Sequence, residues 1–221
     1  ARIAPWVRKR SHTVRGHFPI LTGEAELPAR RVQARRNLGL PEEGLIVANG
    51  GWLTHRKRFD VFLRTAAAVR QTLPGARFII AGGGPEEASL RALAASLDLT
   101  ANVTFTGWTH AIAEYFQAAD VLLFNSNFDT LPRTPGEAMG LGCVVVASLQ
   151  YGGLGELIED GKTGYLMDRH DPGELARKVI AAYTDAARAQ DLREAARQKL
   201  RQDYSQEAST GFYRDFLHGG A

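Results

Sequence analysis

Two carboxylates, Asp129 and Glu137, are separated by seven residues in the stretch FNSNFDTLPRTPGEAMGLG of residues 124–142. They are either a paired functional site or a surface acid and a helix cap. In the second interpretation Glu137 only completes a capping box that begins at Thr134. A helix that begins at Pro132 would instead place Glu137 about a turn inside it, leaning toward the helix N-terminus. The local pattern does not decide between these two helix starts.

A second candidate site is a run of basic residues in GGWLTHRKRFD, which spans residues 50–60. If Thr54 caps the helix predicted after this loop, the first turn holds His55, Arg56 and Lys57. Cations there face the positive end of the helix dipole, which costs a few tenths of a kcal/mol to about 1 kcal/mol each. Free backbone N–H groups combined with positive charge suit a phosphate or another anion. We therefore expect an anion site, the alternative being that these side chains point into water.

The glycine-rich loop AGGGPEE at residues 81–87 is a poor match to a dinucleotide site. A G-x-G-x-x-G pattern that begins at Gly82 would need its third glycine where Glu87 stands. Glu86 and Glu87 would also repel a pyrophosphate. We interpret this loop as a structural turn into a helix, which argues against an NAD-binding enzyme.

Short apolar runs alternate with helical patterns from residue 45 onward, and these elements must position the candidate sites. The runs cover residues 45–50, 77–82, 102–107, 120–124, 143–148 and 163–167. Apolar runs without alternation indicate strands buried on both faces, and strands alternating with helices indicate a parallel sheet. The predicted fold is α/β, a doubly wound parallel sheet (Rossmann-like) followed by C-terminal helices. Such sheets bind ligands beyond the C-terminal ends of their strands, where the candidate loops lie.

The composition is that of a globular chain with a substantial core, since 44% of the 221 residues are hydrophobic and 23% charged. The single cysteine, Cys143, lies in an apolar run, so we expect a buried thiol and a reducing setting. No apolar stretch approaches the roughly 20 residues needed to cross a bilayer. We expect a cytoplasmic protein, with peripheral attachment to the inner face of the membrane as an alternative.

Positive charge is concentrated at the N-terminal end. Residues 1–36 carry nine basic and two acidic residues, or +7, whereas the remainder carries 18 basic and 22 acidic residues, or −4. We expect this basic segment to be solvated or to face a partner domain, and an anionic membrane surface is an alternative partner. No nucleic acid is expected, because interleaved aromatic residues are few and no recognition module is visible.

The chain after the sheet has helical patterns. Asp171 is predicted to cap a helix that has Pro172 in its first position. Four apolar residues near the C-terminal end should need a partner surface, namely Phe212, Tyr213, Phe216 and Leu217. The histidines lie in loops or polar segments without metal-ligand spacing, so no metal site is expected.

Five segments together resemble the C-terminal, donor-binding domain of group 1 glycosyltransferases (glycosyltransferase family 4, GT-B fold). They are VANGGWLTHRKRFDVFL, FIIAGGGPE, VTFTGW, AADVLLFNSNFDTLPRTPGEAMGLGCVVVAS and GGLGELIEDGKTGYLM. The segments follow the family's order and spacing over roughly residues 36–185. The match is therefore far more specific than any single motif.

The resemblance implies that the two carboxylates bind a nucleoside diphosphate sugar. Asp129, which stands where the family usually has Glu, would contact sugar hydroxyls, and Glu137 would hold the ribose. The N–H groups of Thr130 and Leu131 would lie near the sugar and phosphate.

The resemblance also assigns the diphosphate and the base. Lys57 matches a family lysine that binds the diphosphate, beside Arg56 and Gly51. The base would lie against Gly107 and Trp108, where Trp108 either stacks on the base or is an ordinary packed residue. Gly152 and Gly153 match a glycine pair of the family.

Two features depart from the family. Trp52 stands where a second diphosphate-binding Arg is usual, and it cannot make that bidentate contact; Arg56 is a candidate to replace the charge. At most 40 residues precede the donor domain, whereas a GT-B enzyme has an N-terminal acceptor domain. We therefore expect a hinge segment or remnant of that domain at 1–40, the nucleotide-sugar donor domain at 41–203, and a helix at 204–221 that crosses to the missing domain.

Two functions remain open. The first is a retaining glycosyltransferase of polysaccharide or glycoconjugate biosynthesis that moves a sugar from a UDP- or GDP-sugar to a hydroxyl acceptor. This chain would be its donor-binding half, inactive without the N-terminal domain and without a cofactor besides the donor. The second is a non-catalytic nucleotide-sugar binding module or an inactive partner subunit. No residue stands out as a catalytic acid, base or nucleophile.

Overall fold

The computed structural model of the chain describes residues 18, 20, 24–207 and 210. Its centre is a six-stranded parallel sheet in the order β3-β2-β1-β4-β5-β6. The strands are β1 (Ile46–Gly50), β2 (Arg77–Ala81), β3 (Val103–Gly107), β4 (Val121–Asp129), β5 (Val144–Gly152) and β6 (Tyr165–Met167). All six predicted strands are confirmed, and β4 and β5 continue beyond their predicted ends.

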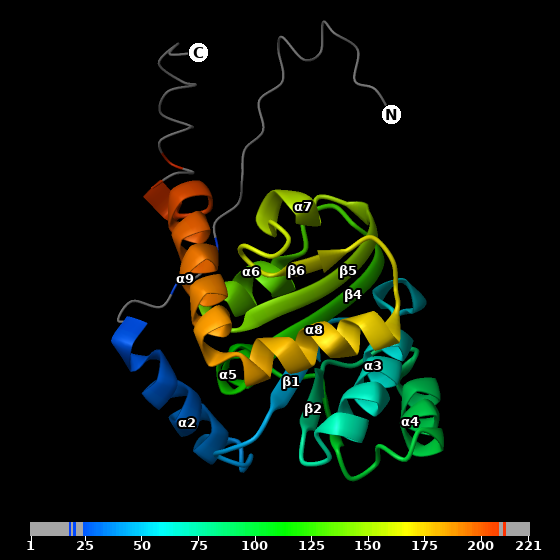
Figure 1. The fold of residues 1–221 in the computed structure, drawn as a ribbon. Coiled ribbons are helices and arrows are strands. Elements are labelled where there is room, and N and C mark those ends of the chain that lie inside the picture. The colour runs from blue at the N-terminus through cyan, green and yellow to red at the C-terminus, as the bar shows by residue number, and fades with distance from the viewer. Residues whose placement is uncertain (1–17, 19, 21–23, 208–209, 211–221) are drawn as a thin grey trace, which may run out of the picture.

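Helices cover both faces of the sheet, as a doubly wound fold requires (Figure 1). One face is covered by α3 (Phe59–Thr72), α4 (Glu87–Ser96) and α8 (Pro172–Thr184). The other is covered by α5 (Ile112–Ala118), α6 (Arg133–Gly140) and α7 (Leu154–Leu157). Helix α9 (Ala186–Asp203) packs on α6, and α2 (Leu27–Asn37) packs on α5. Two 3-10 helices, η1 (Glu24–Glu26) and η2 (His55–Lys57), complete the described elements.

The strands are apolar throughout because each contributes to both cores. In β1, Val47 faces the core under α3 and α8, whereas Ile46 and Ala48 face the opposite core. Cys143 lies in the second core, where burial raises the pKa of its thiol to about 12. The prediction of a buried, unreactive cysteine is therefore confirmed.

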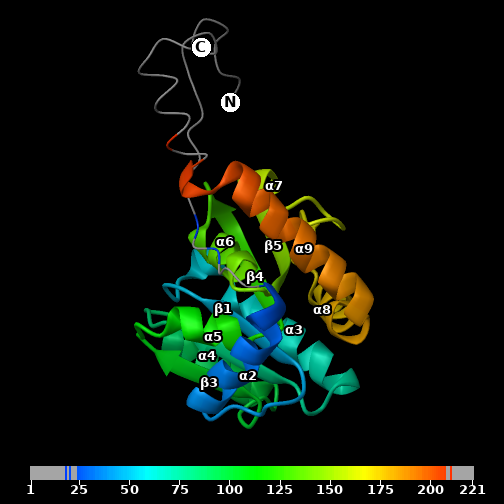
Figure 2. The ribbon, with the colours of Figure 1, turned by 90° about the vertical axis from the view of Figure 1, so that its left-hand side faces the viewer.

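Helix α2 lies beside α5 (Figure 2), and a buried ion pair joins it to the sheet. Its Arg35 is 4% exposed, and Arg35 Nη2 lies 2.7 Å from Asp120 Oδ2. The same carboxylate oxygen accepts a hydrogen bond from the N–H of Ile46 at 2.9 Å, at the start of β1. On the same helix, Arg30 and Arg36 pair with acids at its surface. The described part of the basic N-terminal segment therefore has acid partners within the chain.

The remaining basic residues of that segment lie outside the described residues, as do Phe212, Tyr213, Phe216 and Leu217. The predicted cap at Asp171 is confirmed, because its Oδ1 accepts from the N–H of Glu174 at 2.9 Å. Of the helices that the structure describes, none has the length and apolar character needed to cross a membrane.

Candidate functional site

The C-terminal edge of the sheet carries most of the predicted site residues, because β4 and β5 extend there beyond their neighbours. The pairing of β4 with β1 is confined to its first residues, but its pairing with β5 continues to Asp129 and Gly152. The pairing of β5 with β6 ends at Ser148. Residues 126–129 and 149–152 thus form a two-stranded extension, here called the ribbon. Asp129 stands at its tip.

Gly152 allows the two strands of the ribbon to meet. Its φ is 142°, and a Cβ at this position would lie 1.7 Å from the carbonyl oxygen of Asp129. The next residue, Gly153, donates its N–H to the carbonyl of Thr130 at 2.7 Å. The glycine pair therefore sets how closely β5 passes the residues of the candidate site.

Three consecutive basic residues, two from η2 and one directly after it, hold the ribbon. Arg56 donates to the carbonyl of Phe128, and its Nη1 lies 3.1 Å from Asp129 Oδ2. Lys57 Nζ lies 2.7 Å from the same oxygen. The side chains of Lys57 and Asp129 are only 16% and 15% exposed, so water screens this ion pair less than a surface pair.

The third cation, Arg58, follows η2 and links the ribbon to α3. Arg58 Nη1 donates to Asn127 Oδ1 at 3.2 Å, and Arg58 Nε lies 2.9 Å from Asp60 Oδ1. Its backbone is left-handed, with φ 48° and ψ 45°, which turns the chain from η2 into α3.

The helix start predicted for this basic run was wrong. Thr54 makes no side-chain cap, η2 is a single turn, and α3 begins only at Phe59. The first turn of α3 carries Asp60, as a stable helix start favours, instead of three cations. The basic run therefore contacts the ribbon, and the anion site remains a prediction.

Glu137 belongs to the second of its two predicted settings. Helix α6 begins after Pro132, so Thr134 lies inside the helix and forms no capping box. Glu137 Oε1 accepts from Arg133 Nε at 3.1 Å, and the side chain of Glu137 is 26% exposed. Among the described residues Oε2 has no hydrogen-bonding partner.

Asp129 likewise keeps one oxygen free. Its Oδ2 faces Arg56 and Lys57 and lies 3.3 Å from Ser126 Oγ. Its Oδ1 makes no hydrogen bond within the part of the chain that the structure describes. Thr130 and Leu131 follow directly, in the turn between β4 and α6, with Thr130 exposed and Leu131 half-buried.

Two indoles stand exposed at the ends of β1 and β3. Trp52 is 57% exposed and Trp108 72% exposed, and their rings meet edge to face with centroids 6.5 Å apart. Gly51 and Gly107, both with positive φ, precede them. Of the two interpretations of Trp108, that of a packed residue was wrong.

The glycine-rich loop at 81–87 has the structural role predicted for it. A Cβ on Gly84 would lie 2.6 Å from the backbone nitrogen of Leu53, and one on Gly82 would lie 2.1 Å from the carbonyl oxygen of Gly51. Leu53 also donates its N–H to the carbonyl of Gly83 at 3.0 Å. The loop thus packs against the segment that carries Trp52.

His170 was not among the predicted site residues, although it lies at the same edge, soon after β6. Its Nδ1 lies 2.6 Å from Ser148 Oγ, and its Nε2 lies 3.1 Å from Asn127 Oδ1. Asn127 Oδ1 also accepts from Arg58, so Nε2 carries the hydrogen in the neutral ring and Nδ1 accepts from Ser148. Burial and then the charge of Arg58 lower the pKa of His170. Its place after the last strand is the one sequence signal that pointed to it.

In the described ranges, no three side chains of His, Cys, Asp or Glu are grouped so that they could hold a metal ion.

Comparisons with known proteins place this arrangement in a family. Residues 31–199 match the family model of glycosyl transferases group 1. A D-inositol 3-phosphate glycosyltransferase from Acidothermus cellulolyticus is 34% identical over 203 residues, which are 86% of this chain and 45% of the relative. The chain thus spans less than half the length of that relative.

Solved structures show the same fold. The crystal structure of Anabaena HepE in complex with UDP superposes with a TM-score of 0.79 at 23% identity, over 87% of this chain and 53% of that chain. The C-terminal domain of a glycosyl transferase group 1 family protein (LpcC) from Francisella tularensis has a TM-score of 0.72 at 19% identity, over 86% of this chain and 96% of that chain. The chain therefore belongs to the group 1 glycosyl transferases, and its fold is that of the Rossmann-like C-terminal half of the GT-B architecture.

Proposed function

We propose that this chain is the donor-binding half of a retaining glycosyltransferase that moves a sugar from a UDP-sugar to a hydroxyl acceptor. The observation that carries the proposal is the shielded Lys57–Asp129 pair at the tip of the ribbon. It puts a fixed cation and a carboxylate with one free oxygen side by side at the ligand-binding edge of the sheet. Crystal structures of HepE with UDP and with UDP-glucose support a uridine donor over a guanosine donor.

The diphosphate is assigned to Lys57, Arg56 and the backbone of Gly51. Departure of the nucleoside diphosphate leaves negative charge on its oxygens, and a cation already held in place stabilises that charge without reorganising. Arg56 lies beside Lys57 on the same carboxylate oxygen, so it can supply the charge that Trp52 lacks.

The sugar and the nucleoside are assigned to the residues on either side of this cluster. Asp129 Oδ1, with the N–H groups of Thr130 and Leu131, orients the sugar hydroxyls. Glu137 binds the ribose through Oε2. Gly107 and the exposed face of Trp108 receive the base.

The acceptor and the remaining catalytic groups are assigned to an N-terminal domain. The domain division stays as expected from the sequence, with hinge or acceptor-domain residues at 1–40, donor domain at 41–203, and a crossing helix at 204–221. The isolated chain should therefore bind donor without transferring its sugar. The buried, unpaired Cys143 supports a cytoplasmic setting, in polysaccharide or glycoconjugate biosynthesis.

Titration calorimetry with UDP and UDP-glucose tests the donor site. Lys57→Ala should weaken both ligands by roughly tenfold to a hundredfold, since hydrogen bonds to charged groups contribute about 1.5 to 3 kcal/mol. The matched control is Lys162→Ala, because the Lys162 side chain is 69% exposed and, within the described ranges, pairs with Glu159 alone. Absence of binding at about 1 mM ligand, where the binding free energy is only about −4 kcal/mol, or equal affinities for Lys57→Ala and wild type, would refute the proposal.

A second candidate function is a non-catalytic nucleotide-sugar binding module, and Trp52 is the observation that favours it. An indole in the position of a clamping Arg cannot make the bidentate phosphate contact. The two functions differ in one measurement. If a protein that includes an N-terminal domain binds UDP-glucose and releases no UDP with any acceptor tried, the module is favoured.

A further inference from the structure

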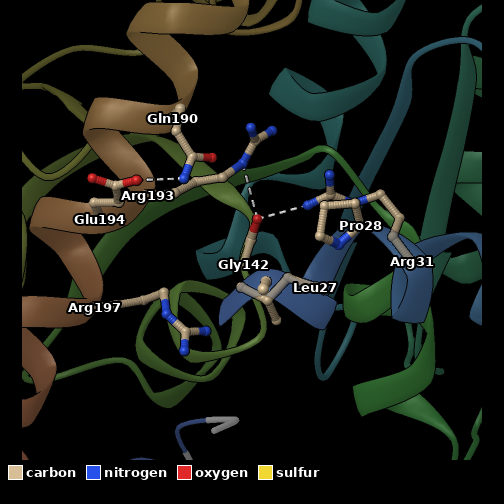
Figure 3. Close-up of a pocket in the computed structure, with 9 residues that line it drawn as sticks. Leu27, Pro28, Arg31, Gly142, Gln190, Arg193, Glu194 and Arg197 are labelled. Atoms are coloured by element: carbon tan, nitrogen blue, oxygen red, sulfur yellow. Dashed lines mark hydrogen bonds between the residues drawn. The ribbon is translucent and has the colours of Figure 1, made fainter. Parts of the chain in front are cut away.

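A cavity of about 220 Å³ lies between α2 and α9, far along β5 from the ribbon (Figure 3). Its lining includes Leu27, Pro28 and Arg31 from α2, Gly142 before β5, and Gln190, Arg193, Glu194 and Arg197 from α9. Gly142 precedes the first residue of β5 and Asp129 ends β4. Because the strands are parallel, the cavity and the donor site lie at opposite edges of the sheet.

Arg31 and Arg193 meet at a neutral backbone carbonyl beside this cavity. The carbonyl of Gly142 accepts from Arg31 Nη2 at 2.7 Å and from Arg193 Nε at 3.1 Å, as Figure 3 shows. Arg197, which is 1% exposed, donates from Nη1 to the carbonyl of Gly140 at 3.1 Å. Carbonyl oxygens satisfy hydrogen bonds but do not neutralise charge.

The described acids near Arg31 and Arg193 compensate these two cations only in part. Asp120 Oδ1 lies 3.7 Å from Arg31 Nη1, but the Oδ2 of this single carboxylate is already paired with the buried Arg35. Glu194 is exposed and accepts from Gln190 beside it. Partly buried like charges repel each other, and burial together with the charge of Arg31 lowers the pKa of Arg193.

Several donors of these arginines are unused. Arg31 Nε is buried and has no hydrogen-bond partner. The two terminal nitrogens of Arg193 have no hydrogen bond within the residues that the structure describes. Together they offer the planar donor groups that bind phosphate oxygens, in a site too small for a nucleotide, since pockets for drug-sized ligands span about 300 to 1,000 Å³. With a water occupying about 30 Å³, one phosphate group and a few waters fit.

We propose that this cavity is an anion site that binds a phosphate group, carried either by a soluble phosphomonoester or by a phospholipid headgroup. Arg31 and Arg193 bind its oxygens, and the apolar walls of Leu27 and Pro28 contact the carbon atoms of the ester. The site is independent of the donor site, so the proposed function can fail without affecting it.

Titration calorimetry with glycerol 3-phosphate measures binding at this cavity. The titrated protein carries Lys57→Ala, so that the donor site does not compete for the ligand. Arg193→Gln should weaken this binding by roughly tenfold or more. Arg177→Gln is the matched control, because Arg177 is an exposed arginine on the neighbouring α8. Circular dichroism checks that each variant is folded. If Arg193→Gln does not fold, Arg31→Gln replaces it as the test variant. Equal affinity in a folded Arg193→Gln or Arg31→Gln variant overturns the proposal.

Sedimentation with phosphatidylcholine vesicles, with and without phosphatidic acid, distinguishes the two sources of phosphate. A lipid site predicts co-sedimentation that requires phosphatidic acid and is lost in Arg193→Gln, whereas a soluble ligand predicts glycerol 3-phosphate binding alone. If neither ligand binds, or if vesicle binding persists unchanged in Arg193→Gln, the assignment is wrong.

Discussion

Lys57 Nζ and Asp129 Oδ2 lie 2.7 Å apart although 72 residues separate them along the chain. The pair fixes η2 against the tip of the ribbon and leaves Asp129 Oδ1 open. In the proposed donor site, this carboxylate would therefore position the cation for the diphosphate through one oxygen and face the sugar with the other. The contribution of the diphosphate and the contribution of the sugar to donor binding can therefore be measured separately.

Asp129→Asn should bind UDP at least as tightly as wild type but lose its preference for UDP-glucose over UDP. The amide no longer neutralises Lys57 and Arg56, so more positive charge faces the diphosphate, while the sugar loses a charged acceptor. Calorimetry with both ligands measures the ratio of affinities, which should fall by roughly tenfold. An equal loss for UDP and UDP-glucose would show that Asp129 acts only through Lys57.

Gly152→Ala should destabilise the protein by about 3 kcal/mol or more, because a Cβ would overlap the Asp129 carbonyl in a backbone conformation that L-residues avoid. Gly161→Ala separates the steric overlap from the backbone strain. Gly161 also has a positive φ, 69°, but the nearest atom would lie 3.9 Å from its Cβ, so only the strain remains. That control should cost about 1 kcal/mol. Urea denaturation measures both, and similar losses would contradict the close approach of β4 and β5.

His170 should make the free energy of unfolding decrease as the pH drops below about 6.5, because the pKa of His170 is lowered in the folded chain. Above its ordinary pKa the ring is neutral in both states, but below it the unfolded chain takes up a proton that the folded chain resists. The charged neighbours are Arg58, which lowers this pKa, and Asp60, which opposes it; Ser148 and Asn127 are neutral.

Thermal melts of wild type and His170→Gln between about pH 5 and pH 8 test this sign. The loss of melting temperature on acidification should be smaller in His170→Gln, whereas the exposed His110→Gln should follow wild type. A loss that is the same in His170→Gln would mean that His170 takes up its proton as readily when folded.

Arg35→Met should cost about 3 kcal/mol, because it removes the cation 2.7 Å from the buried Asp120 and leaves Arg31 Nη1 at 3.7 Å. Arg36→Met on the same helix is the control, since Arg36 and Glu42 form an exposed pair and its loss should cost at most about 1 kcal/mol. Urea denaturation compares the two. If both losses were small, α2 would not fold as one unit with the sheet, and the domain would begin after residue 40.

The strands could be predicted because both faces of the sheet are covered, so each strand core is a plain apolar run. The ribbon could not, since residues 126–129 and 149–152 are mostly polar or glycine and resemble loop sequence. The family resemblance placed Asp129 and Lys57 in one site, but not their direct contact, which depends on the turn at Arg58. The start of α6 was undecided because Pro132 and Thr134 are both acceptable before a helix, and packing against the sheet selected Pro132.

The ribbon also has a kinetic consequence. Its strands have only each other as neighbours in the sheet, so its amide protons can exchange with solvent by a local opening that leaves the six-stranded core intact. Contacts from η2 act on the few residues at its tip, and in the proposed donor site the bound donor would contact the same residues. Donor binding should therefore slow deuterium uptake in residues 126–129 and 149–152 more than anywhere in β1 or β2, and part of the binding enthalpy should be offset by conformational entropy lost there.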